Sequence, residues 1–340
     1  MSASPIIDIR NLRTHFHTEK GRVTAVDDVS FHVGRNEVLG VVGESGCGKS
    51  VTSEAIMQLL NPEITDFEGE ILFDGENLLA LDEARLARIR GNDISMIFQD
   101  TTSSLNPLYT VGDQIIEALQ AHGRQSRQEA ARTALEMVKA TGIPSPEKRL
   151  SEYPHELSGG MRQRIMIAMA LVCRPRLLIA DEPTTALDVT TQAQILDLIM
   201  QMKAELDMAV VFITHDIGVV AEICDRVAVM YLGQVIEDST VESLFDAPLH
   251  PYTRGLMQAM PTIESDPAED LYTIRGRVPS LFDVPTGCRF AERCPYATGK
   301  CRAEAPTLEA ATDGHKVRCW HWKAIAAGEM TESEAELQAG

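Results

Sequence analysis

Short apolar runs recur along the 340-residue chain, and turn-forming residues bound each of them. The runs are rich in Val, Ile and Leu and lack the apolar–polar alternation of a half-exposed strand. Continuous apolar strands are typical of a sheet that is covered on both faces, so the pattern predicts a parallel α/β fold. These predicted strands are residues 38–42, 94–98, 177–180, 210–213 and 227–230.

Turn residues near the N-terminus interrupt short alternating segments and predict two hairpins. The turns read Gly34-Arg35-Asn36 and Asp74-Gly75-Glu76-Asn77. Between Pro107 and Pro154 the pattern becomes helical, and residues 125–140 form a long charged stretch without Gly or Pro.

The character of the chain changes after about Ser243. Prolines divide the following segment into short pieces, and four of the seven cysteines lie there. We therefore predict a small, loop-rich C-terminal extension over residues 244–323. The final residues, 324–340, contain four Glu and no basic side chain, which predicts a frayed helix or a flexible tail.

Composition narrows the possible functions. The chain has 31 Lys and Arg against 50 Asp and Glu, a net charge of −19, which argues against a general nucleic-acid binder. Its longest apolar run, residues 165–173, is shorter than the roughly twenty residues of a spanning helix. No secretory signal is visible at the N-terminus. We expect a cytoplasmic protein with reduced thiols that reaches a membrane only through partners.

A phosphate-binding loop follows the first predicted buried strand. The segment fits the P-loop pattern G-x-x-x-x-G-K-[ST], with an apolar strand before it and a helical pattern from Val51 after it. Its glycines allow successive N–H groups to face an anion, at the positive end of the following helix. In this pattern Lys49 reaches the β- and γ-phosphates and Ser50 ligates Mg²⁺. The loop reads Gly43-Glu44-Ser45-Gly46-Cys47-Gly48-Lys49-Ser50.

Two carboxylates end another predicted buried strand, residues 177–180. Asp181 stands at the strand end, where it could hold Mg²⁺ through water. Glu182 comes one residue later, where it could polarise a water for in-line attack on a γ-phosphate. Because a P-loop lies in the same chain, the pair predicts nucleotide hydrolysis.

A third motif resembles the signature of the nucleotide-binding subunits of ABC transporters. It has Met at its fifth position, where Gln is commoner, as in the peptide-importer subgroup. Ser158 can cap the helix that follows, while Gly159 and Gly160 leave N–H groups open for an anion. The motif reads Leu157-Ser158-Gly159-Gly160-Met161-Arg162-Gln163-Arg164. The resemblance implies a P-loop NTPase domain of the ABC type over residues 1–243. Such a domain has a mixed sheet core, an antiparallel β subdomain and an α-helical subdomain at about 101–165.

The resemblance assigns further residues to the nucleotide site. Gln99, at the end of a predicted strand, matches the Q-loop and would also ligate Mg²⁺. Ala186-Leu187-Asp188 matches the D-loop, and His215 matches the switch histidine. Phe16 would stack on adenine, although Phe31 or His17 could take that place.

The resemblance also implies a mechanism and a set of partners. ATP on the P-loop of one subunit would be covered by Ser158 and Gly160 of a second subunit arranged head to tail. Closure of the dimer would complete the site, and the Q-loop region would pass the motion to membrane-spanning partners. Those partners would be two permease subunits, a solute-binding protein and a homologous ATPase subunit, at the cytoplasmic face of the membrane.

A short segment, His250-Pro251-Tyr252-Thr253, resembles one in oligopeptide, dipeptide and nickel importer ATPases. Peptide is therefore the expected cargo, with nickel, glutathione or another small solute as alternatives. A DNA-repair or translation ATPase is disfavoured because the chain has one P-loop and no room for a coiled-coil insertion. A regulatory module without turnover is disfavoured because Glu182 and His215 are both present.

Four C-terminal cysteines predict a metal or iron–sulfur site in a reduced compartment. Zinc usually shows paired cysteines two to four residues apart, which are absent here. Looser thiolate spacing suits an iron–sulfur cluster, and the importer ATPases that this chain resembles carry a [4Fe–4S] cluster. We therefore expect a structural cluster, with zinc, unligated thiols or artefactual disulfides as alternatives. The cysteines are Cys288, Cys294, Cys301 and Cys319.

Overall fold

The computed structural model describes residues 4–99, 104–123, 125–185, 187–260 and 272–330 of the chain. Contacts divide the chain into two units. The first unit comprises Val33–Val38 and Leu72–Ile213, with the residues up to Ile7. The second comprises Asp8–His32, Leu39–Ile71 and the residues from Thr214 onward.

The first unit contains three parallel strands in the order β6 (Ile94–Ile97), β7 (Leu177–Asp181) and β8 (Ala209–Thr214). Every residue of these strands is buried. The prediction of continuous apolar strands in a parallel sheet is therefore confirmed here. Because the strands are parallel, the residues that follow β6 and β7 come out at one edge of the sheet.

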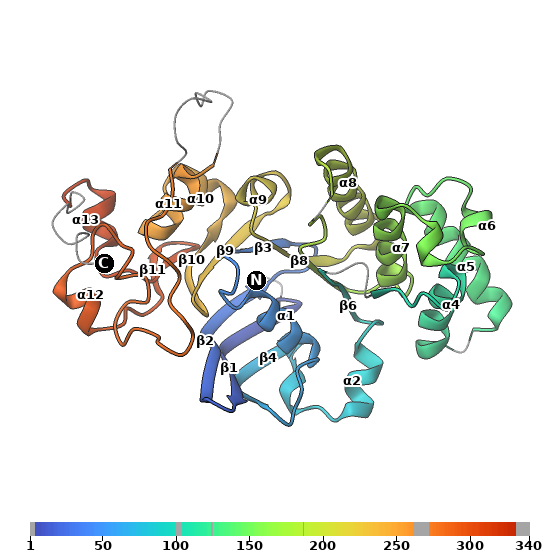
Figure 1. The fold of residues 1–340 in the computed structure, drawn as a ribbon, viewed down its shortest axis with the longest axis horizontal. Helices are drawn as coiled ribbons and strands as arrows, with labels where there is room; N and C mark the ends of the chain where they lie inside the picture. Colours follow the sequence, from blue (N-terminus) through green and yellow to red (C-terminus); the bar gives the residue numbers. More distant parts are fainter. Residues whose placement is uncertain (1–3, 100–103, 124, 186, 261–271, 331–340) are drawn as a thin grey trace. The chain divides into compact units, whose positions relative to one another are not determined.

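Helices dominate the rest of the first unit. Helices α4, α5 and α7 pack against one another, as Figure 1 shows in green. The helical pattern predicted between Pro107 and Pro154 is confirmed. Helix α5 begins at a capping box in which Ser126 and Glu129 satisfy each other's backbone N–H groups. The helices of this unit are α2 (Glu83–Ile89), α4 (Val111–His122), α5 (Arg127–Ala140), α6 (Pro146–Arg149), α7 (Gly159–Leu171) and α8 (Val189–Leu206), with short 3-10 turns at Leu78–Ala80 and Pro154–Glu156.

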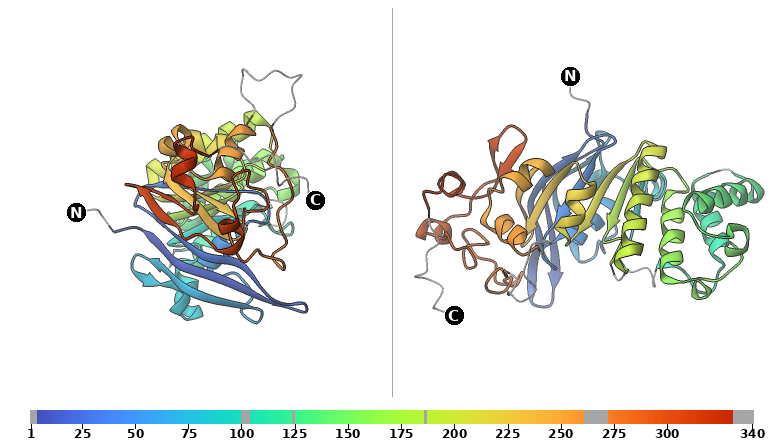
Figure 2. Two further views of the ribbon diagram at one scale, coloured as in Figure 1. Left: turned by 90° about the vertical axis from the view of Figure 1, so that its left-hand side faces the viewer. Right: turned by 90° about the horizontal axis from the view of Figure 1, so that it is seen from above.

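A small sheet in the order β2-β1-β4-β5 lies in the N-terminal part of the chain. The strands β1 (Ile7–Thr18) and β2 (Gly21–Val33) are long neighbours, visible in blue in Figure 2. Strand β4 (Thr65–Phe73) turns at Asp74 and Gly75 into β5 (Glu76–Asn77), so the hairpin predicted there is confirmed.

The hairpin predicted at Gly34-Arg35-Asn36 is wrong. The strand before this turn, β2, belongs to the small sheet, whereas the strand after it, β3 (Val38–Val42), belongs to another sheet. The carboxylate of Glu37 accepts a hydrogen bond from the N–H of Gly34. The turn residues therefore guide the chain from one sheet to the other, a use that local sequence does not distinguish from a hairpin.

The second unit contains a mixed sheet in which β3 lies parallel to β9 (Arg226–Tyr231). Three further strands add antiparallel pairs at the side of β9. They are β10 (Gln234–Thr240), β12 (His315–Val317) and β11 (Glu309–Thr312). The last two come from the region that the sequence predicted as loop-rich, so the C-terminal residues extend the same sheet that carries the phosphate loop.

Short helices accompany the strands of the second unit, and residues 272–298 contain neither helix nor strand. The helices are α1 (Lys49–Met57), α9 (Ile217–Ile223), α10 (Val241–Asp246), α11 (Pro251–Gln258), α12 (Gly299–Ala303) and α13 (Trp322–Ala326). No helix in the described ranges is long and apolar enough to cross a membrane.

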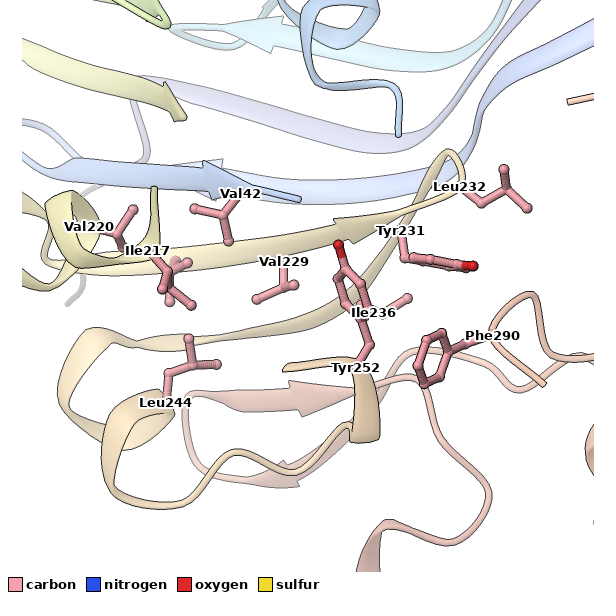
Figure 3. Close-up of a cluster of buried hydrophobic side chains, with 11 residues drawn as sticks. Val42, Ile217, Val220, Val229, Tyr231, Leu232, Ile236, Leu244, Tyr252 and Phe290 are labelled. Atoms are coloured by element: carbon pink, nitrogen blue, oxygen red, sulfur yellow. The ribbon is translucent and has the colours of Figure 1, made fainter. Parts of the chain in front are cut away.

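One apolar core joins β3 to the C-terminal residues of the second unit. Val42, Tyr231, Tyr252 and Phe290 are buried in it together (Figure 3). The ring centroids of Tyr231 and Tyr252 lie 4.9 Å apart, and each ring also contacts Phe290. Burial of a large side chain of this kind contributes about 1.5–3 kcal/mol. The C-terminal region is thus packed onto the element that precedes the phosphate loop.

Candidate functional site

The phosphate loop lies between β3 and α1 in the second unit, as the sequence predicted. Gly43 passes so close to the neighbouring strand that a Cβ there would lie 2.2 Å from the carbonyl oxygen of Met230. Gly48 precedes α1 with a φ of 102°, a left-handed conformation that favours glycine. The close approach leaves no room for a side chain at Gly43, and the backbone conformation favours glycine at Gly48. That the loop N–H groups face a bound phosphate stays a prediction.

Lys49 is the first residue of α1 and is only 5% exposed. Its ammonium group donates hydrogen bonds of 2.8 and 3.2 Å to the carbonyl oxygens of Gly43 and Glu44. The charge is thus held inside the curve of the loop. Ser45 and Gly46 at the tip are exposed, and Ser50 and Val51 continue the first turn of the helix. A cation beside open N–H groups at a helix N-terminus suits a bound phosphate.

Cys47 lies inside the loop with 1% of its surface exposed. Burial raises the pKa of its thiol above the usual value. The sulfur lies 3.9 Å from Nζ of Lys49. Since a protonated, buried thiol reacts slowly, Cys47 serves here as a small packing residue.

Glu182 and Gln99 meet at the edge of the sheet in the first unit. Glu182 follows β7 with a φ of 47°, and its N–H donates to the carbonyl of Ile213. Its carboxylate accepts hydrogen bonds of 2.9 Å from the amide of Gln99 and from the hydroxyl of Thr185. A left-handed conformation at a non-glycine residue costs about 1–2 kcal/mol. The surrounding bonds hold the carboxylate in one direction, which suits a group that must orient a water.

Asp181, the last residue of β7, is 3% exposed. Its carboxylate and the hydroxyl of Ser50 are hard oxygen donors of the kind that Mg²⁺ prefers. Gln99 offers a further amide oxygen. The donor chemistry of these residues therefore fits Mg²⁺.

The signature segment caps α7, as expected. The hydroxyl of Ser158 accepts a hydrogen bond from the N–H of Met161 at 3.4 Å. Ser158 and Gly159 are exposed, and a Cβ at Gly159 would meet nothing within 4 Å. At Gly160 a Cβ would lie 3.3 Å from a methyl group of Thr191. The first turn of α7 thus presents accessible backbone N–H groups.

Two side chains that the sequence analysis did not single out tie these motifs together within the first unit. Gln163 of α7 donates a hydrogen bond of 2.6 Å to the carbonyl of Pro183, directly after Glu182. Thr185 binds the Glu182 carboxylate. Gln163 belongs to the signature motif and Thr185 follows the Asp-Glu-Pro segment. Their positions within or beside these motifs were the only indication in the sequence that they belong to the site. The contacts that they make became visible only in the fold.

Asp188, which the sequence analysis matched to the D-loop, caps α8. Its carboxylate accepts hydrogen bonds from the N–H of Thr191 at 3.0 Å and from the Thr191 hydroxyl at 2.7 Å. The backbone hydrogen bond from Thr191 is the main reason that the pKa of Asp188 lies below its usual value. Ala186 lies outside the described residues.

His215 belongs to the second unit and is exposed between β8 and α9. Asp216 beside it caps α9 by accepting a 2.9 Å hydrogen bond from the N–H of Gly218. Lys49, Ser50 and His215 are therefore in the second unit, whereas Gln99, Asp181 and Glu182 are in the first. Their joint action on one nucleotide stays a prediction.

Of the three candidates for adenine stacking, Phe16 fits best. It lies half-buried on β1. Phe31 is 2% exposed and belongs to the core, and His17 binds the carboxylate of Asp66 at 2.6 Å. The stacking role of Phe16 stays a prediction.

The predicted [4Fe–4S] cluster, and its zinc alternative, are wrong. Among the described residues, no group of three or more His, Cys, Asp or Glu side chains is arranged to hold a metal ion, and Cys288, Cys294, Cys301 and Cys319 are free. They line a small apolar cavity with Phe290 and Trp320. Burial raises the pKa of Cys288 and Cys294, and raises that of Cys319 to about 12.

Comparison with known proteins agrees with the motifs. Residues 26–185 match the ABC transporter family, and residues 236–301 match the oligopeptide/dipeptide transporter C-terminal region. The chain is 54% identical over 319 residues to a probable peptide ABC transporter ATP-binding protein of Sinorhizobium fredii, covering 94% of this chain and 95% of that one. It is 50% identical over 318 residues to the dipeptide transport ATP-binding protein DppD of Bacillus subtilis, covering 93% and 94%.

A solved structure shows the same fold. The dimeric bacterial ABC transporter cassette MJ0796 aligns with a TM-score of 0.62 and 30% identity, covering 69% of this chain and 98% of that one. A post-hydrolysis form of that cassette, bound to ADP and Pi, aligns equally well. The P-loop, signature and carboxylate motifs therefore occur here in a chain with a cassette fold.

Proposed function

This chain belongs to the ATP-binding subunits of ABC transporters, in the oligopeptide/dipeptide group, and from that premise we propose that it hydrolyses ATP to power peptide import. One observation carries the choice of cargo class. The C-terminal region, residues 236–301, matches the oligopeptide/dipeptide transporter region on the same chain as an intact P-loop. The relatives at about half identity carry peptide-transport names over nearly their whole length.

The chemistry follows from the residues at the two motif sites. Lys49 and the N–H groups of the phosphate loop bind the β- and γ-phosphates. Ser50, Asp181 and Gln99 would hold Mg²⁺, which would offset charge on the phosphates. Glu182 orients the attacking water and accepts its proton. His215 contacts the γ-phosphate, and Phe16 stacks on adenine.

We propose that the complete site forms between two subunits. The open first turn of α7, at Ser158 and Gly160, covers the phosphates bound by the partner subunit. Asp188, at the start of α8, accepts a hydrogen bond from Thr191, and Thr191 lies next to Gly160. We therefore place Asp188 on the same face as the first turn of α7. The solved MJ0796 cassettes, which share this fold, are dimeric, and this supports a site that needs two subunits. The second subunit is a homologous ATPase chain.

Membrane subunits would contact the segment that follows Gln99. Leu108 is 80% exposed and Tyr109 is 56% exposed, an apolar pair on the surface just before α4. Exposed apolar side chains at one place often mark a protein interface. We propose that this segment receives the permease subunits at the cytoplasmic face of the membrane. A solute-binding protein delivers the cargo on the other side.

The test is uptake by proteoliposomes that contain this chain, the homologous ATPase subunit, both permeases and the binding protein. ATP enclosed in the vesicles should drive uptake of labelled di- or oligopeptide. Lys49→Ala should abolish uptake and nucleotide binding, whereas Lys139→Ala, on the surface of α5, should leave both unchanged. Uptake of nickel or glutathione in place of peptide would overturn the proposed peptide cargo but would leave the proposed ATPase role standing. Normal uptake by Lys49→Ala would overturn the ATP site.

A further inference from the structure

Glu44, the second residue of the phosphate loop, is held by two residues from the C-terminal region. The hydroxyl oxygen of Tyr252 accepts a hydrogen bond of 3.0 Å from the N–H of Glu44. The guanidinium of Arg293 donates hydrogen bonds of 2.7 and 3.0 Å to the two carboxylate oxygens of Glu44. Backbone and side chain of one loop residue are therefore fixed from positions more than 200 residues away in the chain.

The groups that hold Glu44 are themselves rigid. Tyr252 and Tyr231 are fully buried, and the Arg293 side chain is 5% exposed. Arg293 also donates to the hydroxyl of Tyr231 at 3.4 Å and to the carbonyl of Arg275 at 3.0 Å. Figure 3 shows Tyr231, Tyr252 and Phe290 side by side in the core. A bidentate arginine–carboxylate pair in such surroundings restricts direction as well as distance.

A second arginine of the same segment reaches the other side of the loop. Arg289 donates to the carbonyl of Leu232 and pairs with Asp27. The next residue, Gly233, donates its N–H to the carbonyl of Cys47 at 2.8 Å. The C-terminal segment thus contacts the loop directly at Glu44 and, through the turn at Leu232 and Gly233, at Cys47.

We infer that Arg293 and Tyr252 are positioning residues for ATP, which set the shape of the phosphate loop through Glu44. The inference rests on the proposed ATP site at Lys49. The carbonyl of Glu44 is one of the two oxygens that hold the Lys49 ammonium, so a displacement of Glu44 moves the cation that meets the phosphates. In catalysis, a misplacement of about 1 Å can cost about a hundredfold in rate, so we expect a displaced ammonium to weaken phosphate binding measurably. The C-terminal region therefore controls the affinity for ATP, in addition to containing residues 236–301, which match the oligopeptide/dipeptide transporter region.

The test measures the Kd for ATP on the full chain, by titration at 20 °C, with folding followed by circular dichroism and Tm. Arg293→Gln should raise the Kd about tenfold, and Tyr252→Phe, which loses only the hydroxyl, should raise it about threefold. Arg293→Lys, which keeps the charge without the bidentate geometry, should recover part of the affinity. Arg277→Gln, an exposed arginine of the same segment, is the matched control and should bind ATP normally.

A double variant separates positioning from simple stability. If Arg293 acts through Glu44, the Glu44→Gln/Arg293→Gln pair should bind ATP no worse than Arg293→Gln alone. Unchanged Kd in folded Arg293→Gln and Tyr252→Phe, with only a lower Tm, would overturn the inference. Additive losses would also overturn it. Lys49→Ala distinguishes the two proposals, since normal ATP binding by that variant means that the ATP site itself is misplaced.

Discussion

The amide nitrogen of Gln99 donates a hydrogen bond of 2.9 Å to a carboxylate oxygen of Glu182. The contact joins the end of β6 to the end of β7, because parallel neighbours bring their carboxyl ends to one edge. The Glu182 carboxylate also accepts a hydrogen bond from the Thr185 hydroxyl. Movement of Gln99 would therefore remove one hydrogen-bond donor from Glu182, the group that we propose as general base.

Replacement of Glu182 by Gln should slow ATP hydrolysis about 10²–10⁴-fold, the usual range for a lost general base. The amide retains the size of the side chain, so ATP binding should persist and closed dimers should accumulate. Phosphate release and ATP titration measure the two effects. Glu136→Gln, on the exposed face of α5, is the control and should hydrolyse ATP normally. Normal turnover by Glu182→Gln would show that another group activates the water.

Replacement of Ser158 by Arg should abolish ATP-driven association of cassettes while leaving ATP binding to each P-loop intact. A long charged side chain at the first turn of α7 blocks the surface that we assign to the partner's phosphates. Light scattering after size exclusion, in the Glu182→Gln background with ATP, measures association. Ser126→Arg also removes a helix cap, on α5, and should still associate. Dimers of the Ser158 variant would contradict the head-to-tail arrangement.

Two loop glycines should respond differently to alanine. At Gly43 the added Cβ would lie 2.2 Å from the Met230 carbonyl oxygen, so the strand must shift and the free energy of unfolding should fall by about 3 kcal/mol. At Gly46, with φ at +79°, the Cβ meets nothing within 4 Å, so only backbone strain of about 1 kcal/mol is expected. Urea denaturation measures both values. Equal losses would mean that close packing at Gly43 is not the reason for glycine there.

The C-terminal region should lose stability as the pH falls from about 6.5 to 4. Complete burial of His250 lowers its pKa to about 4. Its ring nitrogen Nδ1 accepts a hydrogen bond from the N–H of Tyr252. In this interval the unfolded chain binds more protons than the folded chain, so the free energy of unfolding decreases with decreasing pH. The expected loss at pH 5 is about 2 kcal/mol.

Urea denaturation at pH 7.5 and 5, followed by tryptophan fluorescence, measures this loss. The only two tryptophans, Trp320 and Trp322, both lie in the C-terminal region. His250→Asn keeps a side-chain acceptor for the helix start and should flatten the pH dependence. The exposed His155→Asn should leave it unchanged. If the free energy of unfolding depends on pH equally in His250→Asn and in the parent chain, other groups cause the loss of stability in acid. Glu237 and His315 are then the nearest candidates in the hydrogen-bond network.

Much of the candidate site was predictable because its parts are local. The P-loop is one strand, one turn and the start of one helix. The Ser158 cap and the carboxylates after β7 also depend on residues within a few positions of one another. Hydrophobic periodicity and capping act over one or two turns of chain, so contiguous residues report them. The turn at 34–36 shows the limit, since the same local conformation serves a hairpin or a passage between sheets.

The sequence by itself determined the motifs, their order and the parallel strands that carry them. Tertiary structure alone decided that Gln99 binds Glu182, that Arg293 and Tyr252 hold Glu44, and that the four C-terminal cysteines are free and line a cavity with Phe290. Spacing along the chain cannot supply these results. Long-range contacts and the protonation of buried groups depend on which strands become neighbours and on how much water the packing leaves around each side chain.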